Sequence, residues 1–216
     1  MSSSQTAGGS RRDRAAQTEV ALKEAARAVF ARSGYLNAKI TDITAEAGRS
    51  AGSFYQHFTG KEQVLQALLA DWIAHAGEEL AAGEAGDDLA QEPALRARVA
   101  VYWRTYRAHL PEIQALGQAA MVDPVFAAQL ARFRHAELQT MREHLERLRD
   151  TGFTLPGDPA VLASAFSALL EGFCAIWLGG GGEPIGRVLG DDEAIDTLTG
   201  LLQHGLAGPR AAASRP

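Results

Sequence analysis

The segment from Ile40 to Lys61, ITDITAEAGRSAGSFYQHFTGK, is the most informative part of this sequence. It contains two short helical patterns, at about residues 40–47 and 50–58, and Gly48 between them accepts the left-handed backbone of a tight turn. Ser50 is a favourable N-cap for the second helix. Two short helices joined in this way predict a helix-turn-helix, whose second helix can enter the major groove of DNA.

The composition of the second helix favours close contact with DNA. Small residues that let a backbone approach a groove stand at its start: Ser50, Ala51, Gly52 and Ser53. Hydrogen-bonding groups for bases or phosphates follow at Tyr55, Gln56 and His57. A glycine inside a helix costs about 1 kcal/mol relative to alanine. Close approach to a surface would explain Gly52, and the alternative is a merely tolerated glycine.

Residues from about 18 to 69 resemble the DNA-binding head of the TetR family of one-component transcriptional regulators. The matching stretches are ARAVFARSGY (26–35), ITDITAEAG (40–48) and SAGSFYQHFTGKEQVL (50–65). Within the last of these, the run Gly52-x-Phe54-Tyr55-x-His57-Phe58-x-x-Lys61 is similar to the family signature G-x-L-Y-x-H-F-x-x-K.

The resemblance implies roles for individual residues. Ser53 and Gln56, with Ala51 and Gly52, would face bases, whereas Tyr55, His57 and Lys61 would contact phosphates. The predicted DNA-binding set is completed by Lys39, Thr41, Arg49 and Ser50. Lys39 and Arg49 depart from the family pattern, which usually has a hydroxyl and an apolar residue there, and both add positive charge. Arg11, Arg12 and Arg14 form either an arm for the minor groove or a solvated tail.

The rest of the chain also reads as helix, without an alternating strand pattern, so we expect an all-α fold of about nine helices. One further helix is predicted to begin at Lys61. The others are predicted at about 15–32, 93–110, 112–120, 124–149, 159–178 and 191–206. The predicted organisation is a disordered tail (1–13), a helix-turn-helix domain (14–60), a ligand-binding and dimerisation domain (61–206) and a second disordered tail (207–216).

Charge and composition narrow the class of protein. Residues 1–61 contain nine Lys and Arg against five Asp and Glu, whereas the rest of the chain contains 12 against 21. A basic head on an acidic body fits a polyanion partner at one end. The single cysteine, Cys174, excludes an intrachain disulfide framework and a multi-cysteine zinc site. The apolar run 161–178 is interrupted by polar residues, so we expect a core helix in a soluble cytoplasmic protein without a membrane partner.

The body carries large side chains on several predicted helices, and the resemblance implies that it binds a small hydrophobic molecule. The candidate ligand-binding residues are Trp72, Trp103, Tyr106, Met121, Phe126, Phe133, Phe173 and Trp177. Each of them fits a cavity lining and an ordinary core equally well. The polar residues His109, Gln118 and Cys174 fall near the same positions.

The last two predicted helices favour a homodimer. The helix at 159–178 is apolar on more than one face, and the helix at 191–206 has its own apolar stripe. The candidate interface residues are Phe166, Leu170, Ile195, Leu198 and Leu202. A two-fold pair would read a palindrome with half-sites about 34–36 Å apart or a multiple of it.

These features predict a ligand-responsive regulator, most simply a repressor that binds palindromic operator DNA as a dimer and is released by a small hydrophobic molecule. A ligand would act by tilting the helix that begins at Lys61. The alternative is a helical regulator that acts mainly through protein partners. An enzyme is disfavoured, because the histidines are scattered and no nucleophile elbow or phosphate-binding loop occurs. We expect no cofactor and no metal.

Overall fold

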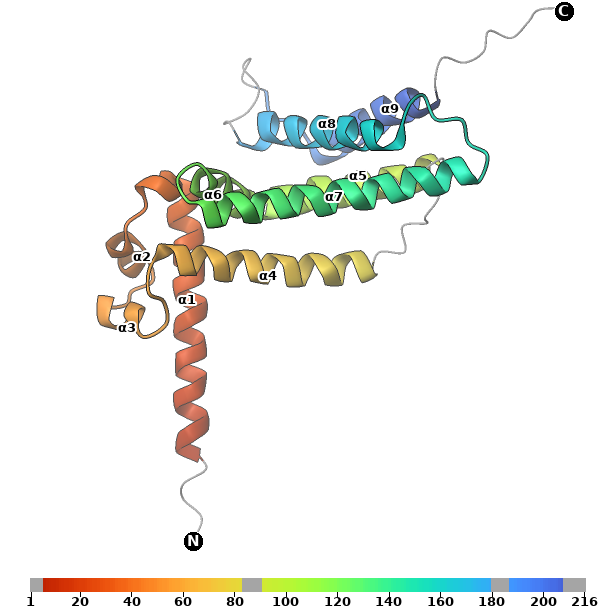
Figure 1. Cartoon of the computed structure of the whole chain (residues 1–216). Coiled ribbons are helices and arrows are strands. Elements are labelled where there is room, and N and C mark those ends of the chain that lie inside the picture. Colours follow the sequence, from red (N-terminus) through yellow and green to blue (C-terminus); the bar gives the residue numbers. More distant parts are fainter. Residues whose placement is uncertain (1–5, 83–90, 180–186, 208–216) are drawn as a thin grey trace, which may run out of the picture. The chain divides into compact units, whose positions relative to one another are not determined.

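The computed structural model describes residues 6–82, 91–179 and 187–207. Within these ranges the chain is all-α, with nine helices and no strand. The helices are α1 (Thr6–Asn37), α2 (Ile40–Glu46), α3 (Ala51–Tyr55), α4 (Lys61–Ala82), α5 (Glu92–Ala108), α6 (Leu110–Ala120), α7 (Pro124–Asp150), α8 (Pro159–Gly179) and α9 (Asp191–Ala207) (Figure 1). The predicted fold class and order of helices are therefore confirmed.

The chain divides into two compact units that are not continuous in sequence. The head unit consists of Met1–Leu80 and His109–Ala127, and the body unit of Ala81–Ala108 and Ala128–Pro216. This division differs from the predicted boundary at residue 61, because α6 packs on α1 and joins the head unit. Sequence position alone had assigned α6 to the body.

The head unit has a core to which each of its helices contributes. The predicted face of α1 is buried through Leu22, Ala26, Val29 and Phe30. Further fully or nearly fully buried side chains are Ile43, Phe54, Phe58, Val64, Leu65, Leu68, Leu69 and Phe126. This burial fixes α2 and α3 beside the C-terminal part of α1 (Figure 1).

The start of α1 differs from the expectation of a disordered tail over residues 1–13. Residues 6–13 continue the helix of α1 toward the N-terminus, whereas residues 1–5 lie outside the described residues. Residues 12–17 are exposed, so no tertiary packing holds these turns. They extend an already nucleated helix, and each added residue then gains a hydrogen bond without a new nucleation cost. Residues 208–216 of the other predicted tail also lie outside the described residues.

Gly34 interrupts α1 without ending it. Its backbone leaves the helix at φ 72° and ψ 160°, and the chain then continues to Asn37. The amide of Gln118 from α6 fills the space beside it, because a Cβ at residue 34 would lie 2.9 Å from Gln118 Oε1. The same oxygen accepts a hydrogen bond from the Leu36 backbone N–H at 3.3 Å. Gly34 therefore lets α6 approach α1 closely.

The core of the body unit is formed by α5, α7, α8 and α9. Trp103 of α5 is buried, and its indole N–H donates to Asp191 Oδ1 at the start of α9 at 2.9 Å. The predicted dimer residues Leu170, Ile195, Leu198 and Leu202 belong to this same core. These four side chains are therefore buried within one chain, and their role in a dimer interface stays a prediction. Phe166 is half-buried at the edge of the core.

The opposite face of α8 is not covered within the body unit. Val161, Ala165, Ala168, Leu169 and Ile176 form an exposed stripe along the helix. Among the described helices, α8 alone is long and apolar enough by composition to cross a membrane, and only 17% of its most apolar window is buried. The expectation of a buried core helix thus holds for one face of α8 only.

Candidate nucleic-acid interface and ligand region

The turn between α2 and α3 has the geometry that the sequence predicted. Gly48 has a φ of 60°, and the backbone N–H of Arg49 donates to Thr44 O at 2.9 Å to close the end of α2. A Cβ at residue 48 would meet no atom within 4 Å, so the backbone conformation alone favours glycine there.

The start of α3 is capped as predicted, since the Ser50 hydroxyl oxygen accepts a hydrogen bond from the Ser53 backbone N–H at 3.2 Å. Phe54 and Phe58 are buried with ring centroids 5.9 Å apart. They anchor α3, which ends at Tyr55 and is therefore shorter than expected. The outer face of α3 is left at the surface as a result.

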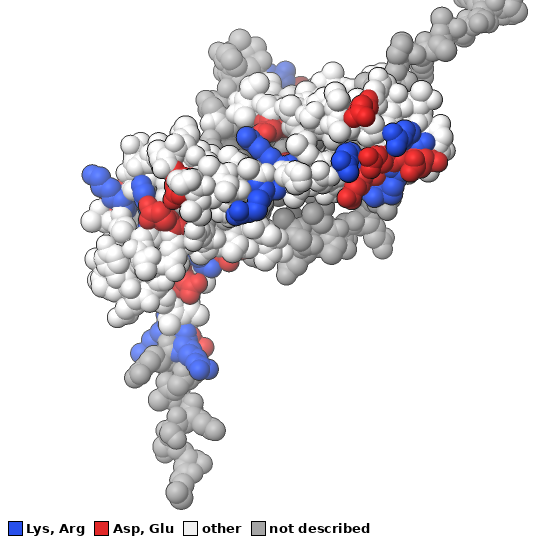
Figure 2. Space-filling view, viewed as in Figure 1, with Lys and Arg blue, Asp and Glu red and all other residues white. Residues whose placement is uncertain are grey.

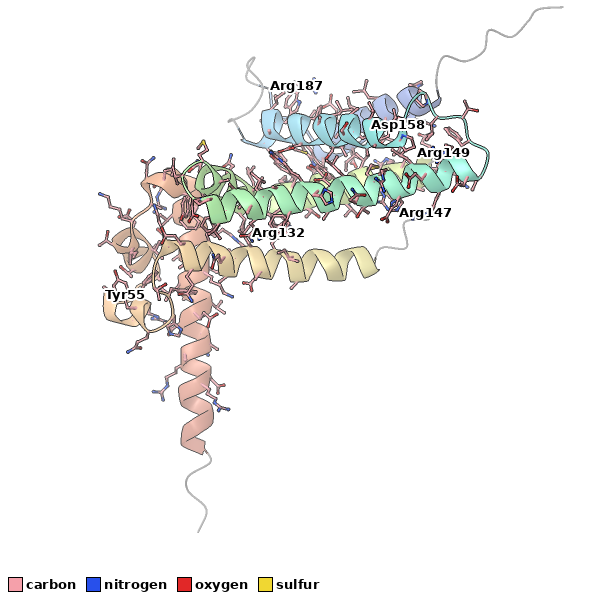
Figure 3. All side chains as sticks on the ribbon, in the orientation of Figure 1. Tyr55, Arg132, Arg147, Arg149, Asp158 and Arg187 are labelled. Carbon is pink, nitrogen blue, oxygen red and sulfur yellow. The ribbon has the colours of Figure 1, made fainter. Side chains whose placement is uncertain are left out.

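The predicted DNA-binding residues lie together on the segment from Lys39 to Lys61. Their side chains are exposed at Lys39, Thr41, Arg49, Ser50, Ala51, Tyr55 and Gln56, as is the Gly52 backbone, and partly exposed at Ser53, His57 and Lys61. Tyr55 is 59% exposed and lies on the outer side of α3 (Figure 3). An aromatic residue this exposed in an otherwise well-packed head is available for a partner.

Gly52 has no role in the packing of the head unit. A Cβ at this position would meet only Ser50 Oγ, at the ordinary contact distance of 3.8 Å. The cost of a glycine inside a helix is therefore not offset by any close contact among the described residues.

We expect alanine substitution at Gly48 and at Gly52 to change the free energy of unfolding in opposite directions. Gly52→Ala should raise the free energy of unfolding by up to about 1 kcal/mol and weaken operator binding, because a methyl group would keep α3 from the groove. Gly48→Ala should lower the free energy of unfolding by about 1–2 kcal/mol, because of its left-handed backbone. Urea denaturation and DNA titration of both variants check this. If Gly52→Ala binds operator as tightly as the wild type, Gly52 is not a close-approach residue.

Lys61 makes contacts within the head unit that the sequence did not predict. Its ammonium group donates to the carbonyl oxygens of Tyr35, Leu36 and Ala38 at 2.8, 3.2 and 3.1 Å. It also lies 4.6 Å from the centroid of the Tyr35 ring. An ammonium group has three N–H donors, so these acceptors use its full capacity. Lys61 therefore joins the end of α1 to the start of α4.

The salt dependence of DNA binding separates the two roles of Lys61. Loss of a phosphate contact lowers the slope of log K against log salt by about 1. We expect Lys61→Met to leave this slope unchanged and to lower the free energy of unfolding, whereas Lys39→Met, which removes an exposed charge, should lower the slope. Titrations at several salt concentrations test both. If Lys61→Met lowers the slope of log K against log salt, Lys61 contacts a phosphate as the sequence predicted.

The remaining basic residues of the head lie on α1. Arg32 pairs with Glu46 at 3.1 Å, which ties α1 to α2. Arg12 and Arg14 lie on the exposed N-terminal part of α1, where Figure 2 shows basic and acidic side chains together. These two arginines therefore stand on an exposed helix, and the side chain of Arg11 lies outside the described residues.

The predicted ligand-binding residues are divided between the two units. Trp72, Met121 and Phe126 belong to the head unit, and the other five belong to the body unit. Phe126 is fully buried with its ring 6.1 Å from that of Tyr35, and Met121 is 70% exposed. These two are therefore a core residue and a surface residue of the head unit, and their role in ligand binding stays a prediction.

The remaining aromatic residues include a connected cluster in the body unit. Phe173 lies between Trp103 and Trp177, with centroid distances of 5.9 and 6.1 Å. Tyr106 contacts Tyr102, one helical turn earlier, at 6.2 Å. Phe133 is partly buried on α7. Tyr102 was missed in the sequence, although its spacing from Tyr106 is a signal that both lie on one face.

Polar side chains that the sequence did not single out lie beside this cluster. Ser167 of α8 donates to Glu137 Oε1 of α7 at 2.9 Å, and Arg134 donates to Glu171 Oε1 at 2.9 Å. Burial raises the pKa of the Cys174 thiol to about 12. Cys174 is therefore a neutral core residue and not a reactive thiolate.

A buried ion pair in the head unit was also missed. Glu112 of α6 is fully buried, and its Oε1 accepts a hydrogen bond from Arg27 Nε of α1 at 2.6 Å. Glu112 Oε2 has no hydrogen-bond partner among the described residues. His109 Nδ1 lies 3.9 Å from Glu112 Oε1, and the His109 ring stacks on Trp72 at 5.4 Å.

No group of three or more His, Cys, Asp or Glu residues that could hold a metal ion occurs in the described part of the chain. The features that the structure does bring together are an exposed helix-turn-helix and an aromatic body with a few polar groups. An exposed helix-turn-helix is typical of a DNA-binding protein.

Comparison with known proteins supports this class. Residues 22–68 match the family model described as bacterial regulatory proteins, tetR family. A TetR/AcrR-family transcriptional regulator from Thermobifida fusca is 25% identical, with a TM-score of 0.60 over 89% of this chain and 98% of that chain. No matching sequence was found among curated proteins.

Two further solved structures share the fold. AibR, in complex with isovaleryl coenzyme A and operator DNA, is 21% identical, with a TM-score of 0.67 over 85% of this chain and 97% of that chain. A Saccharomonospora viridis protein in complex with choline is 21% identical, with a TM-score of 0.70 over 88% of this chain and 98% of that chain. The family match thus places a tetR-family DNA-binding domain at residues 22–68, and the solved structures share the fold of most of the chain.

Proposed function

We propose that this protein is a transcriptional repressor that binds palindromic operator DNA as a homodimer and is released when a small molecule binds the body unit. The observation that carries the proposal is the α3 surface, where small and hydrogen-bonding residues are exposed around buried Phe54 and Phe58. A cytoplasmic location belongs to the same proposal, because the DNA partner is there.

The DNA contacts in this proposal come from α2, the turn and α3. Ser53 and Gln56 would read bases, with Ala51 and Gly52 allowing close approach. Phosphate contacts would come from Thr41, Tyr55 and His57, and from the charges of Lys39 and Arg49. Lys61 positions α4 against α1, because its ammonium group donates to carbonyl oxygens at the end of α1.

The uncovered stripe of α8 supports dimerisation through the last two helices. An exposed apolar stripe on a helix whose other face is already packed is the expected anatomy of an interface. Leu201 of α9, 55% exposed, is a second apolar residue outside the body core. The proposed interface therefore uses Val161, Leu169, Ile176 and Leu201 in place of the buried residues first predicted.

Ligand response is supported by related folds and by the path of the chain. Solved structures of this fold contain isovaleryl coenzyme A with operator DNA in one case and choline in another. In this chain α6 belongs to the head unit but is covalently joined to α5 and α7 of the body. Movement of α5 or α7 on ligand binding would therefore displace Glu112 and Gln118, which hold α1. A coupling of about 1–3 kcal/mol is typical.

Selection of binding sites from random duplex DNA tests the function directly. We expect enrichment of a palindrome, binding by two chains per duplex, and a steep salt dependence. A panel of hydrophobic molecules should contain some that weaken this binding. If no sequence is enriched and binding stays non-specific, the alternative of a regulator acting through protein partners takes its place.

A further inference from the structure

We propose that His109 is a pH-sensitive group, which in its protonated form compensates the buried carboxylate of Glu112 and tightens the contact of α6 with α1. The regulatory meaning of this contact rests on the proposed function, in which the response to a ligand passes through α6. The contacts that carry the inference lie among α1, α4 and α6 of the head unit.

The carboxylate of Glu112 is only partly compensated within the head unit. Its side chain is 0% exposed, and its Oε1 accepts a hydrogen bond from Arg27 Nε at 2.6 Å. Its Oε2 has no hydrogen-bond partner among the described residues. A buried acceptor that lacks a donor keeps the full cost of its lost hydration. A further donor or cation at this position would therefore stabilise the head unit.

Carboxylates outnumber cations where α1 meets α4 and α6. The carboxylates are those of Glu19, Glu24, Asp71 and Glu112. Lys23 Nζ lies 2.7 Å from Asp71 and 4.0 Å from Glu19. Arg27 is shared in the same way, at 2.6 Å from Glu112 and 3.7 Å from Glu24. Two cations thus serve four carboxylates, and the excess negative charge attracts a third cation.

His109 stands where this third cation is needed. It is the N-cap residue of α6, and its Nδ1 lies 3.9 Å from Glu112 Oε1, which is too far for a hydrogen bond. A proton on the ring would bring opposite charges together at this distance. The start of a helix opposes a cation with only about half an elementary charge, so the full charge of Glu112 outweighs it. The His109 side chain is 17% exposed and can exchange a proton with water.

The indole ring of Trp72 favours the same protonation state of His109. The two rings are stacked, with centroids 5.4 Å apart and planes 21° apart. A cation within about 6 Å of the centre of an indole ring is attracted by its electrons. Loss of the proton from His109 would therefore weaken its contacts with both α4 and α6.

The folded protein should accordingly bind a proton at His109 more readily than the unfolded chain does. At the end of α5, the nearby basic residues are Arg104, which is exposed, and Arg107, which is paired with Asp191. The pKa of a histidine in an unfolded chain is about 6.5. The stability gained from this contact is therefore fully present below about pH 6.5 and is lost as the pH rises through the higher titration range of the folded state.

NMR titration of the histidine ring protons tests the inference on the full-length protein. The signal of His109 is the one that is missing from the spectrum of His109→Gln. We expect its titration midpoint to lie about one pH unit or more above that of the histidines in the urea-unfolded protein, which is the usual effect of an opposite charge at this distance. A midpoint equal to or below that of the unfolded protein would overturn the inference.

Variants of two glutamates identify the source of this shift. Glu112→Gln keeps the shape of the side chain but removes its charge, and should lower the titration midpoint of His109 by about one pH unit. Glu143→Gln removes the same charge from an exposed position on α7 of the body unit, and should leave the midpoint unchanged. Equal midpoints in the wild type and in folded Glu112→Gln would contradict the assignment of Glu112 as the partner. If Glu112→Gln does not fold, the wild-type midpoint decides.

Urea denaturation measures the effect on the contact between α6 and α1. The stability difference between the wild type and His109→Gln should be larger at about pH 6 than at about pH 8. In the Glu112→Gln background this dependence on pH should disappear. A difference that is the same at both pH values would show that protonation of His109 does not tighten the head unit.

These outcomes are separable from that of the proposed function. A protein that binds a selected palindrome, but in which His109 titrates as in the unfolded chain, remains a regulator and loses the proton-sensitive contact. A protein in which His109 shows the raised midpoint, but which enriches no DNA sequence, keeps this contact and loses the regulator function.

Discussion

An Arg27→Met variant is expected to lose about 3–5 kcal/mol of unfolding free energy, the usual cost of removing one partner of a buried ion pair. The carboxylate of Glu112 is fully buried, and this substitution removes the arginine that pairs with it. The reverse change, Glu112→Met, should cost less, because the side chain of Arg27 is 33% exposed and can be hydrated. Urea denaturation at fixed protein concentration measures both.

Two controls are a variant that lacks both partners of this ion pair and a variant of an exposed ion pair. Arg27→Met with Glu112→Met should be more stable than Arg27→Met alone, since the uncompensated buried charge is gone. Arg32→Met removes one partner of the Arg32–Glu46 pair, whose side chains are 59% and 40% exposed, and should cost less than about 1 kcal/mol. If Arg27→Met costs no more than Arg32→Met, the pair between α1 and α6 does not hold the head unit together.

Charges placed on the uncovered face of α8 should separate the proposed dimer and lower operator affinity by a hundredfold or more. Leu169→Glu with Ile176→Glu introduces two charges per chain at exposed positions. In a two-fold interface these residues face their own copies or neighbours, so the charges would be brought together and desolvated. A single head then loses the second half-site, which accounts for the fall in affinity.

Sedimentation and operator titration measure this second effect. Val125→Glu is the matched control, because Val125 is a similarly exposed valine on α7 in the head unit. It should leave both the oligomeric state and the affinity unchanged. A double variant that remains dimeric would show that α8 is not the interface, and an unfolded one would be recognised by its circular dichroism.

The head could be predicted from the sequence because its determinants are local. Gly48, Ser50 and the pair Phe54 and Phe58 act within one or two helical turns, and the structure confirms the turn, the cap and the buried rings. The contacts of Lys61 could not be predicted in this way. Its partners are carbonyl groups at the end of α1, which only the folded head unit brings to the start of α4.

The body was less predictable because its determinants are distant or ambiguous. An apolar stripe such as that of α9 indicates that a helix packs, but not whether Ile195 and Leu198 meet α5 of the same chain or a second chain. In the same way, aromatic spacing did not separate Phe126 in the head core from Phe173 in the body. Glu112 lies 85 residues from Arg27, and no sequence pattern links positions that far apart.

The placement of α6 limits how this regulator can be recombined with others. A chimera that joins residues 1–80 to a foreign sensing body would lack Gln118 beside Gly34 and Glu112 beside Arg27. Transfer of the DNA-reading specificity to another scaffold therefore requires two grafts, residues 1–80 and residues 109–127, with both junctions of the second graft kept. The surface residues of α3, the proposed DNA-reading element, can be changed without either graft.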